Sequence, residues 1–291
     1  MSKKILILRT GAIGDIILTF PLVLSCIEQY GNENVTLVGP GYMKPIAYLA
    51  GIDSCIDIDI CGIHKLYTDD FQSREAPSFF RKQDMILNCL TGEENILHKN
   101  LCMLGPEVRS LAPPDDRISM HAAEYLASIL PEINLDIPEA RIIPARFTAV
   151  PDGIKNLFNS EKSILTIHPG TGSPRKLINS DMFEQFISRE AKHKTIIILT
   201  GPADKALVPF AQRMTAEYKG VHLHALPLEQ AAYVLHRSSC YVGLDSGISH
   251  LAGLIDIPSY AVFSATDPAV WKPFSSFVTV ISPEEIENIT I

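Results

Sequence analysis

The sequence lacks the signatures of several familiar protein classes. Its six cysteines form no C-x-x-C pair, and its nine histidines include no H-E-x-x-H pattern, so the common zinc motifs are absent. Most cysteines lie in or beside apolar runs, and we interpret them as buried free thiols of a reducing compartment. The most apolar stretch, from Ile16 to Ile27, covers about half of a membrane span. The first apolar run, from Ile5 to Leu8, is too short for a signal peptide, so we expect a cytoplasmic protein.

Basic residues are also scarce. The chain has 25 Lys and Arg against 33 Asp and Glu, a net charge of −8 with histidine neutral. This balance argues against a general nucleic-acid binder, which needs a basic face, but a small anion can still be held by local groups. With 46% hydrophobic and 20% charged residues, the composition is that of an ordinary globular protein rather than a disordered one. A length of 291 residues predicts two domains or one large domain.

Short apolar runs alternate with amphipathic segments along the whole chain, and this pattern predicts an α/β protein with parallel sheets covered on both faces. Strands are predicted at residues 4–8, 35–38, 55–58, 84–88, 108–111, 163–167, 195–199, 221–224, 240–242, 259–263 and 278–281. Helices are predicted at residues 15–30, 44–50, 121–130, 181–192, 205–219, 228–237 and 247–254. Prolines at 131, 138, 144 and 151 interrupt the rhythm, so we divide the chain into domains 1–150 and 151–291. Ligands of such sheets bind beyond the carboxyl ends of the strands.

The end of the first strand carries a candidate catalytic group. Residues 9–15 contain two glycines but not the G-x-G-x-x-G spacing, and the second strand ends in Gly39-Pro40 rather than in an acid. Both features disfavour a dinucleotide site and hence a dehydrogenase. Asp15 stands at a predicted helix start. It is either a carboxylate favoured there by the helix dipole or a general base.

A polar loop follows the strand at 163–167. Residues 168–176 combine two glycines, two hydroxyls and two cations, a composition suited to holding phosphate oxygens. The loop is not a Walker A motif, because Arg175 stands where that motif needs glycine. The alternative is a surface turn with a solvated basic pair. After the next strand, Asp204 is either a ligand of ribose hydroxyls or a helix cap.

A third polar segment follows the strand at 240–242. Asp245 and Ser246 stand where a helix begins, and Gly247 leaves the first helical amides open to an anion. Ser246 and His250 are four residues apart and share a helical face. A hydrolase elbow is excluded, because Leu244 replaces the glycine that this motif needs two residues before its serine. The alternative for His250 is a packed, hydrogen-bonded histidine.

Together these segments resemble glycosyltransferase family 9, the bacterial ADP-heptose:lipopolysaccharide heptosyltransferases and their relatives. The resemblance is carried by Gly14-Asp15 and by residues 121–126, 168–176, 199–204, 226–230, 245–252 and 263–268. It implies a GT-B fold, in which two Rossmann-like domains face each other across a cleft. It also implies inverting, metal-independent transfer of a heptose or related sugar from an ADP-sugar to a lipopolysaccharide core acceptor, with no cofactor.

The resemblance also implies residue roles. Asp15 matches the proposed catalytic base in the acceptor-side domain, 1–150. The matches to pyrophosphate contacts in the donor domain, 151–291, are Thr171, Gly172, Ser173, Arg175, Lys176, Ser246 and Gly247. The matches to donor sugar or ribose contacts are Asp245, His250 and Asp204. The wall beside the nucleotide base is matched by Leu226, Leu228 and Glu229.

Two departures from the family pattern concern the loop lysine and the end of the chain. The family usually has Trp-Pro shortly after the lysine, whereas this sequence has Leu177-Ile-Asn179, so we expect different loop packing. The resemblance also implies a reduced or missing closing helix, because the sequence stops at Ile291.

The implied acceptor is a lipid-linked oligosaccharide on the inner face of the inner membrane. The basic pairs Arg81-Lys82 and His98-Lys99 offer a peripheral contact with that membrane, unless they are merely solvated. Two alternatives stay open for the function: a GT-B transferase or epimerase with another nucleotide sugar, and a non-catalytic nucleotide-sugar-binding member.

Overall fold

The computed structural model describes residues 3–132, 137–148, 150–159, 162–289 and 291. The chain forms two compact units, Met1–Ala140 (unit 1) and Arg141–Ile291 (unit 2). The sequence division at residue 150 differs from this boundary because the segment after Ala140 already packs on unit 2. The Ile142 N–H donates to the Leu254 carbonyl (2.8 Å), and Arg141 Nη1 lies 3.0 Å from Asp256 Oδ1.

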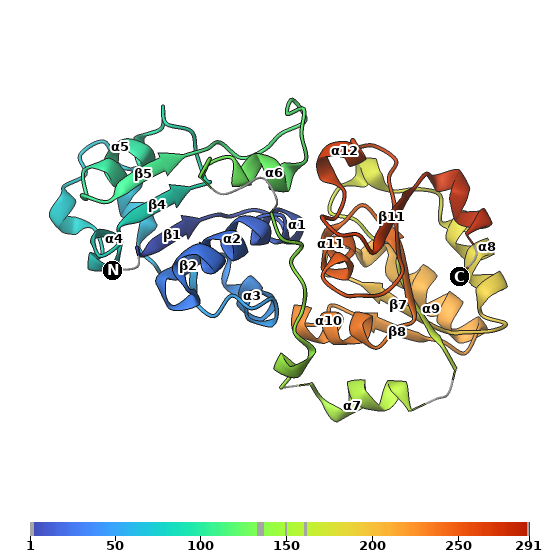
Figure 1. Ribbon diagram of the computed structural model, residues 1–291. Helices are drawn as coiled ribbons and strands as arrows, with labels where there is room; N and C mark the ends of the chain where they lie inside the picture. The colour runs from blue at the N-terminus through green and yellow to red at the C-terminus, as the bar shows by residue number, and fades with distance from the viewer. Residues whose placement is uncertain (1–2, 133–136, 149, 160–161, 290) are drawn as a thin grey trace. The chain divides into compact units, whose positions relative to one another are not determined.

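A five-stranded parallel sheet in the order β3-β2-β1-β4-β5 forms the centre of unit 1 (Figure 1). The strands are β1 (Ile5–Leu8), β2 (Val35–Gly39), β3 (Cys55–Asp57), β4 (Met85–Asn88) and β5 (Glu107–Ser110). Every residue of β1 is buried, and Ile5 is in register with Val35 on one side and Met85 on the other. The uninterrupted apolar β1 is therefore the central strand, as expected for a parallel sheet covered on both faces.

The helices of unit 1 are short. They are α1 (Ile13–Ile17), α2 (Phe20–Tyr30), α3 (Lys44–Leu49), α4 (Ser78–Arg81), α5 (Ile96–Cys102) and α6 (Ala122–Ala127). Helix α2 packs on β1, β2 and α6. Helix α5 and the 3₁₀ helix η3 (Ile63–Tyr67) enter one apolar cluster with Leu6, Leu8 and Ile86, which closes one face of the sheet.

The helix predicted at 15–30 is two helices, α1 and α2, separated at Leu18 and Thr19. Pro21 has no N–H to donate to the Ile17 carbonyl. The Thr19 N–H turns to the Ile16 carbonyl (3.0 Å), and the Thr19 hydroxyl takes its place at the Asp15 carbonyl (2.9 Å). Among the described residues, Ile13–Tyr30 is long and apolar enough to cross a membrane, and 61% of it is buried inside the structure. A core helix passes the same test of length and composition, so this is weak evidence for a membrane span.

The sheet of unit 2 has six parallel strands in the order β11-β10-β9-β6-β7-β8. The strands are β6 (Ile164–His168), β7 (Thr195–Thr200), β8 (Val221–His224), β9 (Cys240–Leu244), β10 (Ser259–Val262) and β11 (Val278–Ile281). The helices are α7 (Asp152–Lys155), α8 (Ser180–Glu190), α9 (Val208–Glu217), α10 (Leu228–His236), α11 (Gly247–Gly253) and α12 (Pro268–Trp271).

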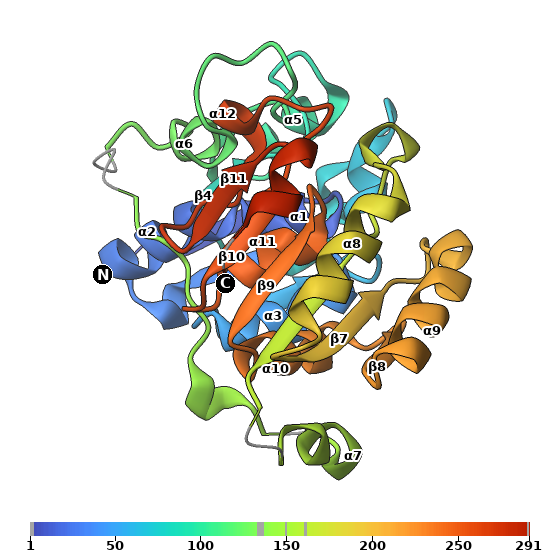
Figure 2. The same cartoon turned by 90° about the vertical axis from the view of Figure 1, so that its right-hand side faces the viewer.

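Two helical layers cover this sheet. Figure 1 shows α8 and α9 on one side of its strands and α10 and α11 on the other, and the first layer faces the viewer in Figure 2. Phe183 and Met214 of the first layer pack in one cluster with Leu165 and Val242 of the strands. The cluster also includes Ile286 of the 3₁₀ helix η9 (Pro283–Asn288), which packs against α8. The last described helical segment thus packs within unit 2.

Candidate functional site

The loop after β6 meets the loop after β9 at the carboxyl edge of the sheet in unit 2. Lys176 Nζ lies 2.7 Å from Asp245 Oδ2, and the Thr171 hydroxyl donates to the Asp245 carbonyl (2.9 Å). Asp245 is 4% exposed in its side chain and Lys176 is 26% exposed. The carboxylate therefore anchors an ammonium that still reaches the surface. These residues are 69 or more positions apart in sequence, and the parallel strand order β9-β6 brings them together.

The loop after β10 completes this arrangement. The Thr266 hydroxyl donates to the same Asp245 Oδ2, and the Ser264 hydroxyl donates to the Lys176 carbonyl (3.1 Å). Both hydroxyls also line a cavity of about 500 Å³ that includes Ser282 and Glu285 at the end of β11. Neither Ser264 nor Thr266 was predicted as a site residue. The segment 263–268 carried the family resemblance, but the contact itself depends on β10 lying next to β9.

The loop itself leaves room for a ligand. Gly172 is exposed, and a Cβ built on it would have no heavy atom within 4 Å. The following 3₁₀ turn η7 (Pro174–Lys176) is closed by the Lys176 N–H, which donates to the Ser173 carbonyl (3.0 Å). Arg175 and Leu177 are both exposed. The loop thus presents open backbone beside an anchored lysine, an arrangement that suits phosphate oxygens.

The start of α11 adds polar groups to this edge. Ser246 is the N-cap of the seven-residue helix, and its hydroxyl accepts the Ser249 N–H at 3.4 Å. The Ser249 hydroxyl donates to the Leu244 carbonyl (2.5 Å) and contacts the Tyr241 hydroxyl (2.9 Å), which fixes the turn from β9 into α11. Gly247 is half-buried, whereas His250, one turn later, is 6% exposed.

Asp204 lies against His168 in the interior. Its Oδ2 accepts the Gly201 N–H at 2.6 Å and lies 3.9 Å from His168 Nε2, while His168 Nδ1 contacts the Leu199 carbonyl at 3.0 Å. Burial lowers the pKa of His168, although its contacts with Leu199 and Asp204 act in the opposite direction. The Asp204 side chain makes no helix-capping hydrogen bond, so of its two predicted alternatives the cap is not formed.

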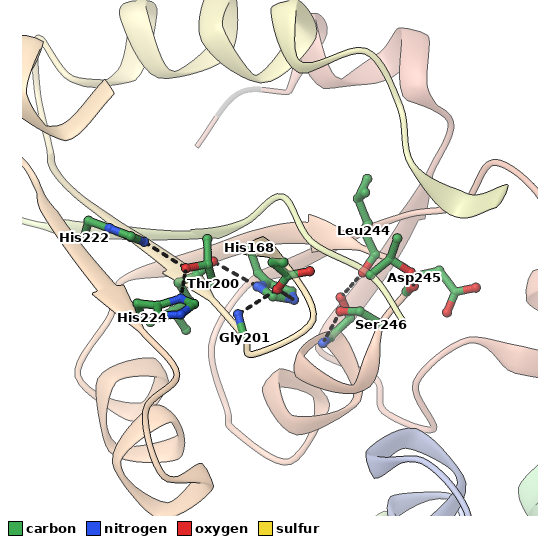
Figure 3. A network of polar contacts seen from close by, with 12 residues as sticks. His168, Thr200, Gly201, His222, His224, Leu244, Asp245 and Ser246 are labelled. Atoms are coloured by element: carbon green, nitrogen blue, oxygen red, sulfur yellow. Dashed lines mark hydrogen bonds and ion pairs between the residues drawn. The ribbon is translucent and has the colours of Figure 1, made fainter. Parts of the chain in front are cut away.

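Two histidines that sequence reasoning missed share one hydroxyl. Thr200 Oγ1 lies 2.8 Å from His222 Nε2 and 2.9 Å from His224 Nδ1, as Figure 3 shows. His222 and His224 are two residues apart in β8, so they point to the same face of the strand. Burial and the neighbouring His224 lower the pKa of His222. The spacing His-x-His was the available sequence signal.

The predicted base wall follows β8. Leu226 lies in the turn after the strand, and Leu228 and Glu229 begin α10; all three are half-buried. Ala225 has a φ of 52°, which turns the chain sharply between His224 and these residues. These three residues therefore lie at the same carboxyl edge of the sheet as the loop at residues 168–176.

Asp15 lies in unit 1, at the carboxyl end of β1. Its Oδ2 accepts the Ala12 N–H at 2.8 Å, and its Oδ1 lies 3.5 Å from Arg9 Nη2. Arg9 is 3% exposed and also donates to the Cys89 carbonyl (3.1 Å). Burial lowers the pKa of the Arg9 guanidinium, while the charge of Asp15 acts to raise it. The Asp15 side chain remains 32% exposed, so one carboxylate is both oriented and accessible.

The predicted residues thus fall into separate groups. Thr171 and Lys176 both contact Asp245, Asp204 lies against His168, and Asp15 belongs to the other unit. Within the described ranges, no group of three or more His, Cys, Asp and Glu residues is placed to hold a metal ion.

Comparisons with known proteins show which family and which solved structures this chain is similar to. The family model described as glycosyltransferase family 9 (heptosyltransferase) matches residues 123–290. A family 9 glycosyltransferase from Veillonella parvula has a TM-score of 0.74 at 17% identity, over 97% of this chain and 87% of that one. The ADP-heptose LPS heptosyltransferase II of E. coli has a TM-score of 0.73 at 16% identity, over 98% of this chain and 96% of that one. The E. coli heptosyltransferase WaaC, solved with ADP, has a TM-score of 0.69 at 16% identity, over 99% of this chain and 96% of that one. No curated protein matches the sequence.

Proposed function

The chain belongs to glycosyltransferase family 9, and we propose that it moves a heptose or related sugar from an ADP-sugar to a lipopolysaccharide core acceptor. Transfer inverts the anomeric carbon and needs no metal. Solved relatives are described as an ADP-heptose LPS heptosyltransferase and as a heptosyltransferase with ADP, which supports an ADP-sugar as donor. The observation that carries the proposal is the Lys176–Asp245 contact at 2.7 Å, because it joins two of the family segments at one edge.

Lys176 acts on the leaving group. Negative charge grows on the diphosphate as its bond to the sugar C1 breaks, and preorganised donors aimed at that charge lower the barrier. The Lys176 ammonium has three N–H donors, of which one is directed at Asp245, so others remain for phosphate oxygens. Amides of Thr171, Gly172, Ser173 and Gly247, the Ser246 hydroxyl and Arg175 contribute further donors. His250 and Asp204 serve the donor sugar and ribose, and Leu226, Leu228 and Glu229 the base.

Asp15 acts on the acceptor. Its carboxylate takes the proton of the acceptor hydroxyl while that oxygen attacks C1 on the face opposite the diphosphate. One C–O bond forms, the bond from C1 to the diphosphate breaks, and the proton ends on Asp15. A positioned base contributes on the order of 10²–10⁴ in rate.

The acceptor also suggests where the protein works. A lipid-linked core oligosaccharide is reached from the cytoplasm at the inner face of the inner membrane. Arg81 and Lys82, both exposed at the end of α4, supply cations for a peripheral contact with anionic lipid headgroups.

Calorimetry with ADP tests the donor site. We expect Lys176→Ala to weaken ADP binding about tenfold or more, since a charge-assisted hydrogen bond contributes roughly 1.5–3 kcal/mol. Lys192→Ala, which removes an exposed lysine after α8, is the matched control and should bind as wild type. Equal affinities for wild type and Lys176→Ala would refute the phosphate-loop assignment.

A turnover assay tests the reaction itself. Release of ADP from ADP-heptose in the presence of a core oligosaccharide should continue in excess EDTA, and the product should have the opposite anomeric configuration to the donor. Loss of turnover in EDTA with recovery on adding a divalent cation would contradict the metal-independent mechanism. Turnover with UDP- or GDP-sugars alone would replace the proposed donor.

A further inference from the structure

A cavity in unit 1 is not used by the reaction as described so far. Its volume is about 410 Å³, and three turns line it: residues 10–11, 40–42 and 57–59. These turns follow β1 and β2 and include the end of β3, which are neighbours in the sheet. All of the lining residues belong to unit 1, so the cavity is formed by that unit alone, at the edge where parallel sheets bind ligands.

The cavity adjoins the candidate base. Gly11 lines the cavity, and a Cβ added to Gly11 would lie 2.6 Å from Asp15 Oδ2. Tyr42, a second lining residue, donates its hydroxyl hydrogen to the Gly11 carbonyl at 3.0 Å. Burial and the charge of Asp15 both raise the pKa of Tyr42. The Asp15 carboxylate is therefore close to the wall that Gly11 and Tyr42 form.

The lining groups match the chemistry of a sugar ring. Tyr42 is 52% exposed while its hydroxyl is tied down, so an oriented aromatic face is available to the C–H side of a ring. Asp57 and Asp59 supply carboxylate oxygens, which accept hydrogen bonds from hydroxyl groups. Asp57 is itself oriented: its Oδ1 accepts the Asp59 N–H at 3.1 Å.

The charges that line the cavity restrict which sugar rings it can accept. The lining residues include two carboxylates and no Lys, Arg or His. The Arg9 side chain is buried, and its Nη1 and Nη2 contact the Cys89 carbonyl and Asp15. A phosphate or carboxylate in the cavity would therefore face like charges without a partner, which is unfavourable, whereas neutral hydroxyls would not.

We propose that this cavity holds the acceptor sugar whose hydroxyl reacts, and that it selects an uncharged, hydroxyl-rich ring over one bearing a phosphate or carboxylate. The inference rests on the proposed function, because it takes Asp15 as the base. Tyr42, Asp57 and Asp59 are then specificity-determining residues of the acceptor side.

The test compares two acceptor probes on the full chain in EDTA without donor: the methyl glycoside of an aldoheptose and the same glycoside carrying a phosphate monoester. Ligand-observed NMR titration measures both affinities. We expect the neutral glycoside to bind at least about tenfold more tightly. Equal binding, or tighter binding of the phosphorylated probe, overturns the proposal. Binding of either glycoside that appears only when a divalent cation replaces EDTA overturns it too, since the carboxylates would then be a cation site.

Variants assign the preference to the cavity. Asp57→Asn combined with Asp59→Asn should abolish most of the preference by improving the phosphorylated probe, and Tyr42→Ala should weaken both probes. Asp70→Asn removes one exposed charge of unit 1 outside the cavity lining and should leave both affinities unchanged. Gly41→Ala is a second route, because its Cβ would overlap the Asp57 carboxylate and displace it. A preference that survives all of the cavity variants refutes the assignment.

ADP calorimetry on the same samples separates the two proposals. Failure to bind ADP while the neutral glycoside is still preferred refutes the proposed donor chemistry and leaves the sugar site. Normal ADP binding without preference for the neutral glycoside refutes the sugar site and leaves the transferase.

Discussion

Asp15 is held at the start of α1 by two contacts of different kinds. The Ala12 N–H fixes one carboxylate oxygen at 2.8 Å, and the buried Arg9 guanidinium lies 3.5 Å from the other. The sequence left two interpretations of this residue, a helix-start carboxylate and a general base. The structure shows the first arrangement, and the side chain stays 32% exposed, so the carboxylate is also accessible for the second role.

Substitution of Asp15 by asparagine separates these roles. Asp15→Asn retains an oxygen for the Ala12 N–H but loses the basic carboxylate, so we expect kcat for transfer to fall by at least about 100-fold. Affinity for ADP should not change, because the nucleotide contacts are proposed in unit 2. Steady-state kinetics and calorimetry measure the two quantities, and a variant with near-wild-type kcat would remove Asp15 from the mechanism.

His168 contributes a pH dependence to stability. Burial keeps its imidazole neutral by lowering its pKa below the ordinary value of 6.5. The unfolded chain therefore binds a proton at higher pH than the folded chain, so acidification below about pH 6.5 favours unfolding. The stability contributed by the neutral imidazole is present above that pH and is lost as pH falls toward the folded-state pKa.

Replacement of His168 by asparagine tests the direction of this pH dependence. Asn can still donate toward the Leu199 carbonyl, but it cannot be protonated. Urea denaturation between pH 7 and pH 5 should show a smaller loss of unfolding free energy in His168→Asn than in wild type. The slopes of unfolding free energy against pH should differ by the equivalent of at most one bound proton. Parallel curves for the two proteins would contradict the assignment, since His222 and His236, whose pKa values burial also lowers, remain in both.

At the scale of elements, β9 shows how a strand is shaped for the helix that follows it. Tyr241 and Gly243 point to one face of β9, and the Tyr241 hydroxyl contacts Ser249 of α11 at 2.9 Å. A Cβ on Gly243 would overlap that hydroxyl. Gly243 is therefore required by the path of the tyrosine side chain, which in turn holds the turn that presents Asp245 and Ser246.

Alanine at this position should destabilise unit 2. Overpacking of a buried site typically costs about 1–3 kcal/mol, so Gly243→Ala should lower the unfolding free energy by that amount. Gly153→Ala provides the control, because a Cβ there meets no heavy atom within 4 Å. Chemical denaturation of both variants measures the difference, and a Gly243→Ala protein as stable as the control would show that Tyr241 can move aside at no cost.

Elements with a strong apolar pattern were predictable, and the shortest ones were not. Strands β8 and β11 have the predicted ends, because each is a compact β-rich run. Helices α4, α7 and α12 span four residues each, too few to establish a helical period. The seven-residue α5 was missed as well. Asn95 caps this helix by accepting the Leu97 N–H, so an asparagine cap was the available signal.

At the scale of the whole molecule, each unit carries its own part of the candidate chemistry. The two sheets were predictable from the repeated strand–helix pattern, whereas ligand binding at their carboxyl edges stays a prediction. The contact of Thr266 with Asp245 and the cavity that Tyr42 lines were not predictable, because both depend on which strands are neighbours, and the local sequence does not specify strand order.

Hydrogen exchange can test this division. We expect ADP to slow exchange most in residues 169–176 and 245–249 of unit 2, where its diphosphate is proposed to bind. Residues 40–42 and 57–59 of unit 1 should respond instead to the neutral glycoside. Mass spectrometry of peptic peptides resolves these segments, and slowing by ADP that is strongest around residues 40–42 would contradict the assignment of the nucleotide to unit 2.

The pairing of Lys176 with Asp245 has a consequence for salt. A bare cation attracts mobile chloride, which an incoming nucleotide must displace, so its affinity falls steeply as ionic strength rises. Here a fixed carboxylate 2.7 Å away already balances the ammonium. Little chloride accumulates at such a neutral pair, and ADP affinity should therefore decline only gently with added NaCl, while Asp245→Asn should make that decline steeper.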